Sequence, residues 1–388
     1  MTKWILRLWV KDVDRMQDQD VRERCGVVSG MVGIVLNLCL FAAKLLAGLL
    51  TGSIAIMADA FNNLSDAGSS IITLVGFKMA GRPADPEHPF GHGRIEYVAG
   101  FVVSMIVILM GAELLKSSVE KIFAPETVAF SWISLGILVA SILVKGWMCL
   151  FNRKLGKLID STAMQATAMD SLSDAVATTT VVIGIGITQW TGWSVDGYTG
   201  LIVALFILYT GVKTAKETLS PLLGEKPSPE LVEQIKRTVL SHEDIIGIHD
   251  LIIHNYGPGR SMISLHAEVP AGTDVIKMHD TIDMIEYQLR DQFHCDAVIH
   301  MDPIDLDDAR TNAMYRQLAT MVKSIDPSLS IHDFRMTQGH SHTNLIFDLV
   351  VPYRFRMTDQ QLKDEVYERV HQWEGTYYVV INIDRLYV

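Results

Sequence analysis

The sequence lacks the features that several large classes of protein require. Its net charge is −11, and it has no basic patch or stripe of the kind that nucleic-acid-binding proteins carry. It has no nucleophile–base pair and no phosphate-binding loop, so we do not expect an enzyme. No cleavable signal peptide is evident. Four cysteines are spaced neither as a disulfide framework nor as a CxxC metal site, which favours a reduced, cytoplasmic setting for the soluble part: Cys25, Cys39, Cys149 and Cys295.

Apolar residues make up 49% of the 388-residue chain, and they are unevenly distributed. Residues 26–215 contain nearly all the long apolar runs, whereas residues 220–388 have the composition of a soluble domain. Six segments approach the ~20 residues that a helix needs to cross the hydrocarbon core: 26–50, 54–80, 95–116, 129–152, 161–188 and 195–215. We therefore expect an α-helical membrane domain of six transmembrane helices over residues 26–218, preceded by an amphipathic segment over residues 1–25.

Basic residues predict the orientation of this membrane domain. They occur in the N-terminal segment, in residues 78–94, in residues 153–157 and after residue 212, whereas residues 51–53 and 190–194 carry none. The positive-inside rule then places both termini in the cytoplasm. We expect a multi-pass protein of the cell membrane.

The soluble part has the pattern of a small α+β domain. Helices are predicted over residues 229–241 and 274–293, and strands over 246–256, 260–269 and 296–301, which gives the order αββαβ of a ferredoxin-like domain over residues 219–305. Residues 306–388 repeat this pattern from a helix over 308–324 onward: Ile331-His332-Asp333-Phe334 echoes Ile248-His249-Asp250-Leu251, and residues 380–384 echo 298–302. We expect a second, diverged copy of the domain, which either extends a dimer interface or binds a partner.

Two segments inside the apolar part share the pattern Ala-x-Ala-x-(Asn/Asp)-x-Leu-Ser-Asp-Ala, over residues 58–67 and 166–175. On a helix, Asn62 and Asp66 lie one turn apart on one face, and so do Asp170 and Asp174. A carboxylate at mid-membrane costs about 2.5–3.5 kcal/mol on insertion scales, so these side chains need a compensating partner. A cation held among four oxygen ligands is the partner that we favour. Asp59, one turn before Asn62, is interpreted as structural or accessory.

The sequence resembles the cation diffusion facilitator family over about residues 20–305. The resemblance rests on the six-span pattern, the paired aspartate motifs, the loop over residues 82–94, and the segments His249-Asp250-Leu251 and His300-Met301-Asp302-Pro303. The family consists of homodimeric exporters that exchange a cytoplasmic divalent metal for protons. The resemblance implies such an antiporter in the lipid bilayer, with no prosthetic group and with its transport site at Asn62, Asp66, Asp170 and Asp174.

The ligand types in this quartet bear on the choice of metal. The zinc-transporting branch of the family typically has a histidine at the position held here by Asn62 or Asp170, and this chain has none there. Carboxylate and amide oxygens suit Mn²⁺, whereas imidazole suits Zn²⁺. The quartet therefore resembles the manganese-exporting branch. An Fe²⁺ or Zn²⁺ exporter, or a metal-sensing membrane scaffold that moves no ion, remains the alternative.

The resemblance also implies two further metal sites. Asp85, His88 and His92 match the family's second site, although a rigid loop that caps the adjacent spans is an equally good interpretation. The cytoplasmic metal cluster of the family corresponds here to His249, His266, His279, His300 and Asp302, whose alternative is a set of histidines satisfied on a sheet surface. Lys145 lies within a span, where it either snorkels or pairs with a carboxylate.

Overall fold

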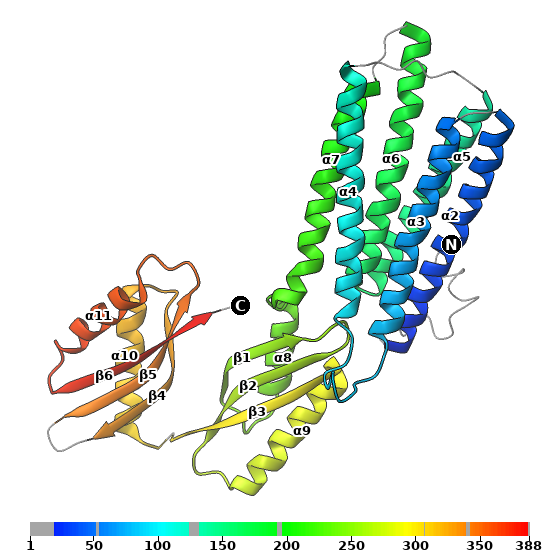
Figure 1. The fold of residues 1–388 in the computed structure, drawn as a ribbon. Helices are drawn as coiled ribbons and strands as arrows, with labels where there is room; N and C mark the ends of the chain where they lie inside the picture. Colours follow the sequence, from blue (N-terminus) through cyan, green and yellow to red (C-terminus); the bar gives the residue numbers. More distant parts are fainter. Residues whose placement is uncertain are drawn as a thin grey trace. The chain divides into compact units, whose positions relative to one another are not determined.

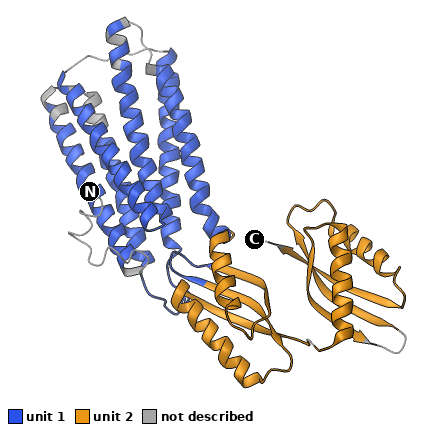
Figure 2. Ribbon diagram, turned by 180° about the vertical axis from the view of Figure 1, so that it is seen from behind, with its two compact units in different colours: residues 1–225, 255–261 blue, residues 226–254, 262–388 orange. Residues whose placement is uncertain are grey.

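The computed structural model describes residues 19–51, 54–123, 132–191, 196–305, 307–338 and 342–386. The predicted amphipathic segment over residues 1–25 lies mostly outside these residues. The chain forms two compact units (Figure 2). Unit 1 comprises residues 1–225 and 255–261, and unit 2 comprises residues 226–254 and 262–388.

Long helices form most of unit 1 and run lengthwise beside one another (Figure 1). Their bounds are α2 (Gln19–Thr51), α3 (Ile54–Ala80), α4 (Ile95–Phe123), α5 (Trp132–Leu158), α6 (Thr162–Thr191) and α7 (Asp196–Leu219). Within the described residues, four segments are long and apolar enough to be membrane spans: Val21–Leu46, Ile95–Phe123, Leu135–Leu158 and Gly197–Leu223. These segments lie in α2, α4, α5 and α7, whereas α3 and α6 carry the polar motifs. The sequence prediction of six spans is therefore supported for four helices.

Close packing of α2 against α3 depends on two glycines of α2. A Cβ atom on Gly30 would lie 2.6 Å from Leu74 Cβ, and one on Gly33 would lie 2.6 Å from Ser70 Oγ. Small residues allow helix backbones to approach each other closely in this way. The contact fixes α3, and hence its polar motif, against α2.

A buried ion pair joins the start of α2 to the start of α4. Arg22 Nη2 lies 3.1 Å from both carboxylate oxygens of Glu96, and it also donates a hydrogen bond of 3.4 Å to the carbonyl of Asp160. The two side chains are only 9% and 4% exposed. The charges therefore compensate each other in a place that water reaches poorly.

Unit 2 contains two lobes that have the same order of elements. The first lobe consists of α8 (Pro229–Leu240), β1 (Gly247–Asn255), β2 (Ser261–Pro270), α9 (Val275–Phe293) and β3 (Cys295–Ile304), with the strands in the order β1-β2-β3. The second lobe consists of α10 (Ala309–Ile325), β4 (Ser330–Gln338), β5 (Thr343–Pro352), α11 (Asp359–Val370) and β6 (Tyr377–Leu386), with the strands in the order β4-β5-β6. In the second sheet β5 pairs antiparallel with β4 and parallel with β6. That the second lobe is a diverged copy of the first remains a prediction.

Each lobe has a hydrophobic core of its own. In the first lobe, alternate residues of β2 such as Ile263 and Leu265 pack against α8 and α9, which contribute Ile235 and Ile285. In the second lobe, Leu345 and Phe347 of β5 belong to a separate core with residues of α10 and α11. Alternation along the strand turns one face of each sheet toward its helices and leaves the other face for polar side chains.

The first strand of each lobe has an aspartate with an unusual backbone conformation. Asp250 of β1 has φ 51°, and Asp333 of β4 has φ 49°. In β4 the pairing register shifts between His332 and Arg335, as a β-bulge requires. Aspartate tolerates this left-handed conformation better than most residues. The bulge turns the aspartate away from the regular alternation of its strand.

Candidate metal sites

The aspartates of the two polar motifs lie deep in the helical unit. Asp66 of α3 is 2% exposed, and Asp170 and Asp174 of α6 are 4% and 7% exposed. Thr73 Oγ1 of α3 and Thr167 Oγ1 of α6 are 2.8 Å apart and form a hydrogen bond. The two motif-bearing helices are therefore neighbours at the level of these carboxylates.

Lys145 of α5 supplies the cation between two of these carboxylates. Its Nζ lies 2.6 Å from Asp66 Oδ2 and 2.6 Å from Asp174 Oδ2. The lysine side chain is only 3% exposed. The motif residues Asp66 and Asp174 thus point toward one another around a positive charge. Lys145 pairs with carboxylates, which was one of the two arrangements expected from the sequence.

Asp170 lies one turn before Asp174 on α6, and its Oδ1 is buried with no hydrogen-bond partner among the described residues. The remaining predicted ligand, Asn62, is exposed on α3, whereas its neighbour Asn63 is buried. The side chain of Asp59 lies outside the described residues. Three of the four residues predicted for the transport site are therefore buried at one place, and the part played by Asn62 remains a prediction.

The loop that follows α3 brings Asp85, His88 and His92 together, with one ligand atom of each within 4.8 Å of the others. Asp85 accepts backbone hydrogen bonds from Glu87 (3.0 Å) and His88 (2.7 Å), and the His88 bond is the main cause of its lowered pKa. His92 Nε2 lies 3.3 Å from Asp85 Oδ2. These bonds also make the loop rigid, so both interpretations of the loop remain compatible with its geometry.

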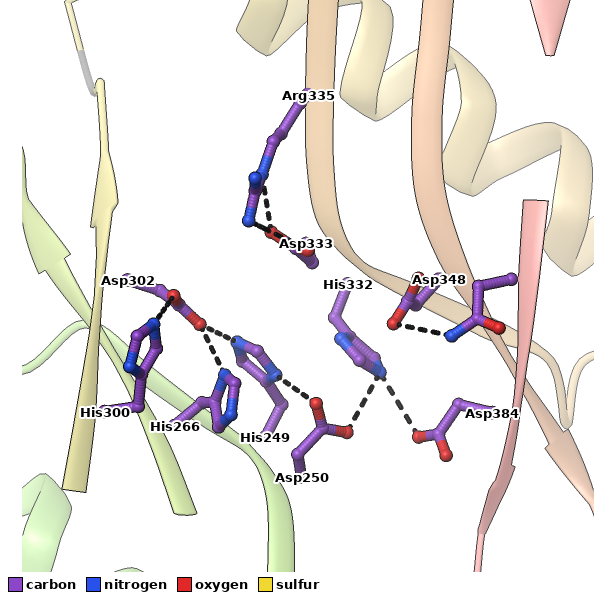
Figure 3. A network of polar contacts seen from close by, with 11 residues as sticks. His249, Asp250, His266, His300, Asp302, His332, Asp333, Arg335, Asp348 and Asp384 are labelled. Atoms are coloured by element: carbon purple, nitrogen blue, oxygen red, sulfur yellow. Dashed lines mark hydrogen bonds and ion pairs between the residues drawn. The ribbon is translucent and has the colours of Figure 1, made fainter. Parts of the chain in front are cut away.

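The first lobe of unit 2 brings four of the five predicted cytoplasmic ligands together, three histidines around the carboxylate of Asp302 (Figure 3). Asp302 Oδ2 lies 2.8 Å from His266 Nδ1 and 3.1 Å from His249 Nε2, and Asp302 Oδ1 lies 3.3 Å from His300 Nε2. His249, His266 and Asp302 have ligand atoms within 4.8 Å of one another. Imidazole and carboxylate are ordinary ligands for divalent transition metals.

His279, the fifth predicted ligand, has a different environment. It lies on α9, and its Nδ1 is 3.3 Å from Asp283 Oδ2, one turn further along the same helix. Its side chain is 65% exposed. Among the described residues it belongs to none of the groups that can hold a metal ion. The local pairing along α9 accounts for this position, so the chain as described does not bring His279 to the cluster.

Sequence reasoning did not identify the residues that extend this cluster into the second lobe. Asp250 lies next to His249, and His332 of the second lobe lies 3.7 Å from Asp250 Oδ1. The only signal in the sequence was the echo of His249-Asp250 in His332-Asp333. It indicated a repeat but gave no contact between the lobes.

Comparison with known proteins identifies both parts of the chain. Residues 30–223 match the cation efflux transmembrane domain, and residues 227–304 match the cytoplasmic domain of cation efflux proteins. An uncharacterized transporter of Methanocaldococcus jannaschii is 30% identical over 276 residues, which cover 71% of this chain and 97% of the relative. The manganese efflux system protein MneS of Bacillus subtilis is 30% identical over 288 residues, 72% of this chain and 96% of the relative.

The cation-efflux pump FieF of Salmonella typhi is a further relative, 27% identical over 266 residues that cover 68% of this chain and 88% of the relative. Helices that are long and apolar enough to span a membrane agree with these matches. The chain is therefore an integral membrane protein that belongs to the cation efflux family, the cation diffusion facilitators, and it is a cation transporter rather than an enzyme.

Proposed function

We propose that this protein exports Mn²⁺ from the cytoplasm in exchange for protons. The observation that carries the proposal is the group of three buried carboxylates, Asp66, Asp170 and Asp174, in the helical unit. Three carboxylates buried together require positive charge, and a hard divalent ion bound by oxygen atoms supplies it. The similarity to a relative named as a manganese efflux protein supports the same metal.

Lys145 gives the proposed cycle its metal-free state. Its ammonium group lies where an ion between Asp66 and Asp174 would lie, 2.6 Å from each. An incoming Mn²⁺ ion has to displace this ammonium group because two cations cannot share the space. Protons arriving from outside neutralise carboxylates and release the metal, after which Lys145 returns. Rearrangement of the helices between the two states exposes the site to one side of the membrane at a time.

The arrangement in the membrane follows from the same proposal. All six long helices cross the bilayer of the cell membrane, and both termini lie in the cytoplasm. The polar faces of α3 and α6 then turn toward the other helices, which compensates for their low hydropathy. The protein acts as a homodimer, in keeping with the cytoplasmic domain that it shares with cation efflux proteins. The transport site includes Asn62, and Asp59 supports it without binding the ion.

Reconstitution into proteoliposomes tests the transport proposal. With Mn²⁺ on the cytoplasmic side, the unmodified protein is expected to move Mn²⁺ and to drive proton movement in the opposite direction. Asp66→Asn and Asp174→Asn should each abolish both fluxes, because each removes one of the carboxylates that face Lys145. Glu217→Gln, at an exposed ion pair of α7, is the control and should leave both fluxes unchanged. Mn²⁺ flux that persists in the two aspartate variants would overturn the proposal.

The same assay distinguishes the alternative functions. A metal-sensing scaffold produces no metal-dependent proton movement even in the unmodified protein. An Fe²⁺ or Zn²⁺ exporter moves that ion in preference to Mn²⁺. Asn62→His should shift the preference of the unmodified protein from Mn²⁺ toward Zn²⁺, since it introduces an imidazole into an oxygen-only set. An unmodified protein that transports Zn²⁺ but no Mn²⁺ contradicts the choice of metal, though not the export function.

A further inference from the structure

The contact between the two lobes of unit 2 contains a second group of metal-ligating side chains (Figure 3). Asp250 of β1 lies between two histidines: its Oδ2 is 3.4 Å from His249 Nδ1, and its Oδ1 is 3.7 Å from His332 Nε2 of β4. His332 Nε2 is also 3.3 Å from Asp384 Oδ2 of β6. We propose that a divalent transition-metal ion binds here, held by His249, Asp250 and His332, with Asp384 in reach as a fourth ligand. We name these four residues the junction site.

Burial of the two imidazoles is the first argument for a ligand. The side chain of His249 is 8% exposed and that of His332 is 10% exposed. Within the described residues, neither ring nitrogen of His249 forms a hydrogen bond of good geometry, although Nδ1 lies 3.4 Å from Asp250 and Nε2 lies 3.1 Å from Asp302. Leaving a buried polar atom without a partner is costly, and almost all such atoms in folded proteins have one. A metal ion at the junction site provides this partner.

The distances fit a metal site that closes slightly around its ion. The ligand atoms of His249, Asp250 and His332 all lie within 4.8 Å of one another. Ligand atoms around a tetrahedral ion with bonds of ~2.0–2.1 Å lie roughly 3.4 Å apart, so small rotations of the side chains complete the geometry. The site also opens into a cleft between the lobes that Asp348, Lys236 and Arg385 line, which gives an ion a route of entry.

The ligand types separate this site from the one in the membrane. Two imidazoles with one or two carboxylates form a mixed nitrogen–oxygen set. Such a set binds the later divalent ions of the first transition series, Zn²⁺ included, more tightly than Mn²⁺. The proposed transport site, in contrast, is built from the carboxylate oxygens of the buried aspartates and contains no imidazole. The junction site is therefore expected to retain Zn²⁺ more strongly than Mn²⁺ and to act as a bound ion rather than as cargo.

The corresponding aspartate of the second lobe, Asp333, has a different partner. Asp333 shares the left-handed backbone of Asp250, yet its carboxylate accepts two hydrogen bonds from Arg335, of 3.0 and 3.1 Å. The guanidinium group compensates its charge. Of these two aspartates, Asp250 is therefore the one that contacts histidines of both lobes, which explains why the junction site is asymmetric.

His249 also belongs to the group around Asp302, and this sharing has a consequence. Its Nε2 faces Asp302 at 3.1 Å, whereas its Nδ1 faces Asp250 at 3.4 Å. A neutral imidazole has one lone pair for a metal, and its other nitrogen carries a proton. His249 therefore binds one ion at a time. When its Nδ1 binds an ion at the junction site, its Nε2–H donates to Asp302, and when its Nε2 binds an ion beside Asp302, its Nδ1–H donates to Asp250. An ion at the junction site competes with one in the first lobe and ties the second lobe to the first.

The test uses the full-length protein in detergent and Zn²⁺ as the probe. His266→Ala disables the group around Asp302 but leaves the junction site complete, so it serves as the background. Adding His332→Ala or Asp250→Asn to this background should remove one equivalent of bound Zn²⁺ or weaken its binding at least tenfold. Asparagine tolerates the left-handed backbone at position 250, so this second variant removes the charge without straining the fold.

The control adds His371→Ala to the same background, because His371 is an exposed histidine of the second lobe that bonds to the carbonyl of Tyr367. This variant should bind as much Zn²⁺ as His266→Ala alone. If either His332→Ala or Asp250→Asn leaves both the amount and the affinity of bound Zn²⁺ unchanged, no ion binds between the lobes and the inference is wrong.

Discussion

Lys145 is the residue on which the proposed cycle depends most directly. A tethered ammonium group 2.6 Å from Asp66 and Asp174 competes with the metal for the same two carboxylates. Lys145→Met keeps much of the side-chain volume and removes the charge. We expect Mn²⁺ to bind about tenfold more tightly, equivalent to ~1.4 kcal/mol, and turnover to fall because nothing returns to displace the ion.

Equilibrium binding of Mn²⁺ and initial rates in proteoliposomes measure these two effects separately. Lys213→Met is the control, since Lys213 is an exposed lysine of α7 that pairs with Glu217. It should change neither quantity. Weaker Mn²⁺ binding in Lys145→Met, with turnover unchanged, would show that the lysine supports the bound state instead of competing with it.

At the scale of single residues, the sequence predicted carboxylates better than their partners. The motif spacing placed Asp66 and Asp174 on helix faces because helical periodicity is a local property, and in the structure both carboxylates contact one ammonium group. It could not indicate that Lys145, from another helix, lies between them. It also could not rank Asn62 against Asn63: the structure buries Asn63, and a difference of one position corresponds to about 100° around a helix.

Among the elements, the ion pair between Arg22 and Glu96 connects the beginnings of α2 and α4. Arg22→Ala leaves the Glu96 carboxylate buried without its cation, which typically costs about 3–5 kcal/mol. Thermal unfolding of the protein in detergent should therefore shift to lower temperature. Replacing both residues, as in Arg22→Met with Glu96→Leu, should restore most of the lost stability, because well-packed apolar groups substitute for a buried pair.

An exposed ion pair of α4 provides the comparison. Lys116 and Glu120 are 78% and 67% exposed and lie 4.0 Å apart. Pairs of this kind contribute little, so Lys116→Ala should leave the unfolding temperature unchanged. If Arg22→Ala is as mild as this control, the pair at the start of α2 does not hold the two helices together.

The first turn of α10 is expected to depend on pH through its capping residue. Asp308 accepts hydrogen bonds from the hydroxyl and backbone N–H of Thr311 and from the N–H of Arg310, which lower its pKa. A lowered pKa in the folded state means that the charged form stabilises the helix above the ordinary value of 3.8. This contribution is lost as the pH falls through the still lower folded value.

Amide exchange over the first turn of α10 measures this effect. Exchange should be faster in Asp308→Ala than in the unmodified protein at pH 7, with Asp308→Asn between them because asparagine also caps helices. The difference between the unmodified protein and Asp308→Asn should shrink as the pH falls below 3.8 and disappear below the still lower folded pKa, where the aspartate takes up its proton. A difference that is independent of pH would mean that the carboxylate charge does not contribute.

For whole elements, periodicity predicted the soluble part closely and the membrane part less well. The helix predicted over residues 229–241 is observed as Pro229–Leu240, and the strand predicted over 246–256 is Gly247–Asn255. In contrast, the span predicted over residues 95–116 is a helix that continues to Phe123. Its last turns carry Lys116, Glu120 and Lys121, and a hydropathy pattern registers the apolar length of a helix rather than its full length.

At the scale of the molecule, the second lobe is the part that the family resemblance does not cover. The family models end at residues 223 and 304, and the Bacillus subtilis relative matches 72% of this chain but 96% of itself. Internal repetition in the sequence predicted a second lobe with the same order of helices and strands. It could not predict the contact of His332 with Asp250, since that contact depends on how folded lobes meet and leaves no local pattern.

Deleting residues 306–388 tests what this lobe contributes. The first lobe should still fold, because its core lies entirely within residues 231–301. We expect the maximal rate of Mn²⁺ transport to be retained, since the carboxylates in the helical unit are untouched. We expect the truncated dimer to dissociate at a higher protein concentration than the full-length dimer. Tyr378 and Val380 on the outer face of β6 are 50% and 55% exposed, and the deletion removes the apolar area that they offer to a second subunit.

Sedimentation of the full-length and truncated proteins over a range of concentrations measures the dimer, and proteoliposome flux measures transport. Tyr378→Ser with Val380→Ser in the full-length chain is the matched variant, since it alters the outer face and leaves the inner core of the lobe intact. It should weaken the dimer to the same degree as the deletion. If neither change affects association, the prediction that the second lobe contributes to the dimer is wrong. The lobe then contacts another partner, and its role within this chain is to supply His332 to the junction site.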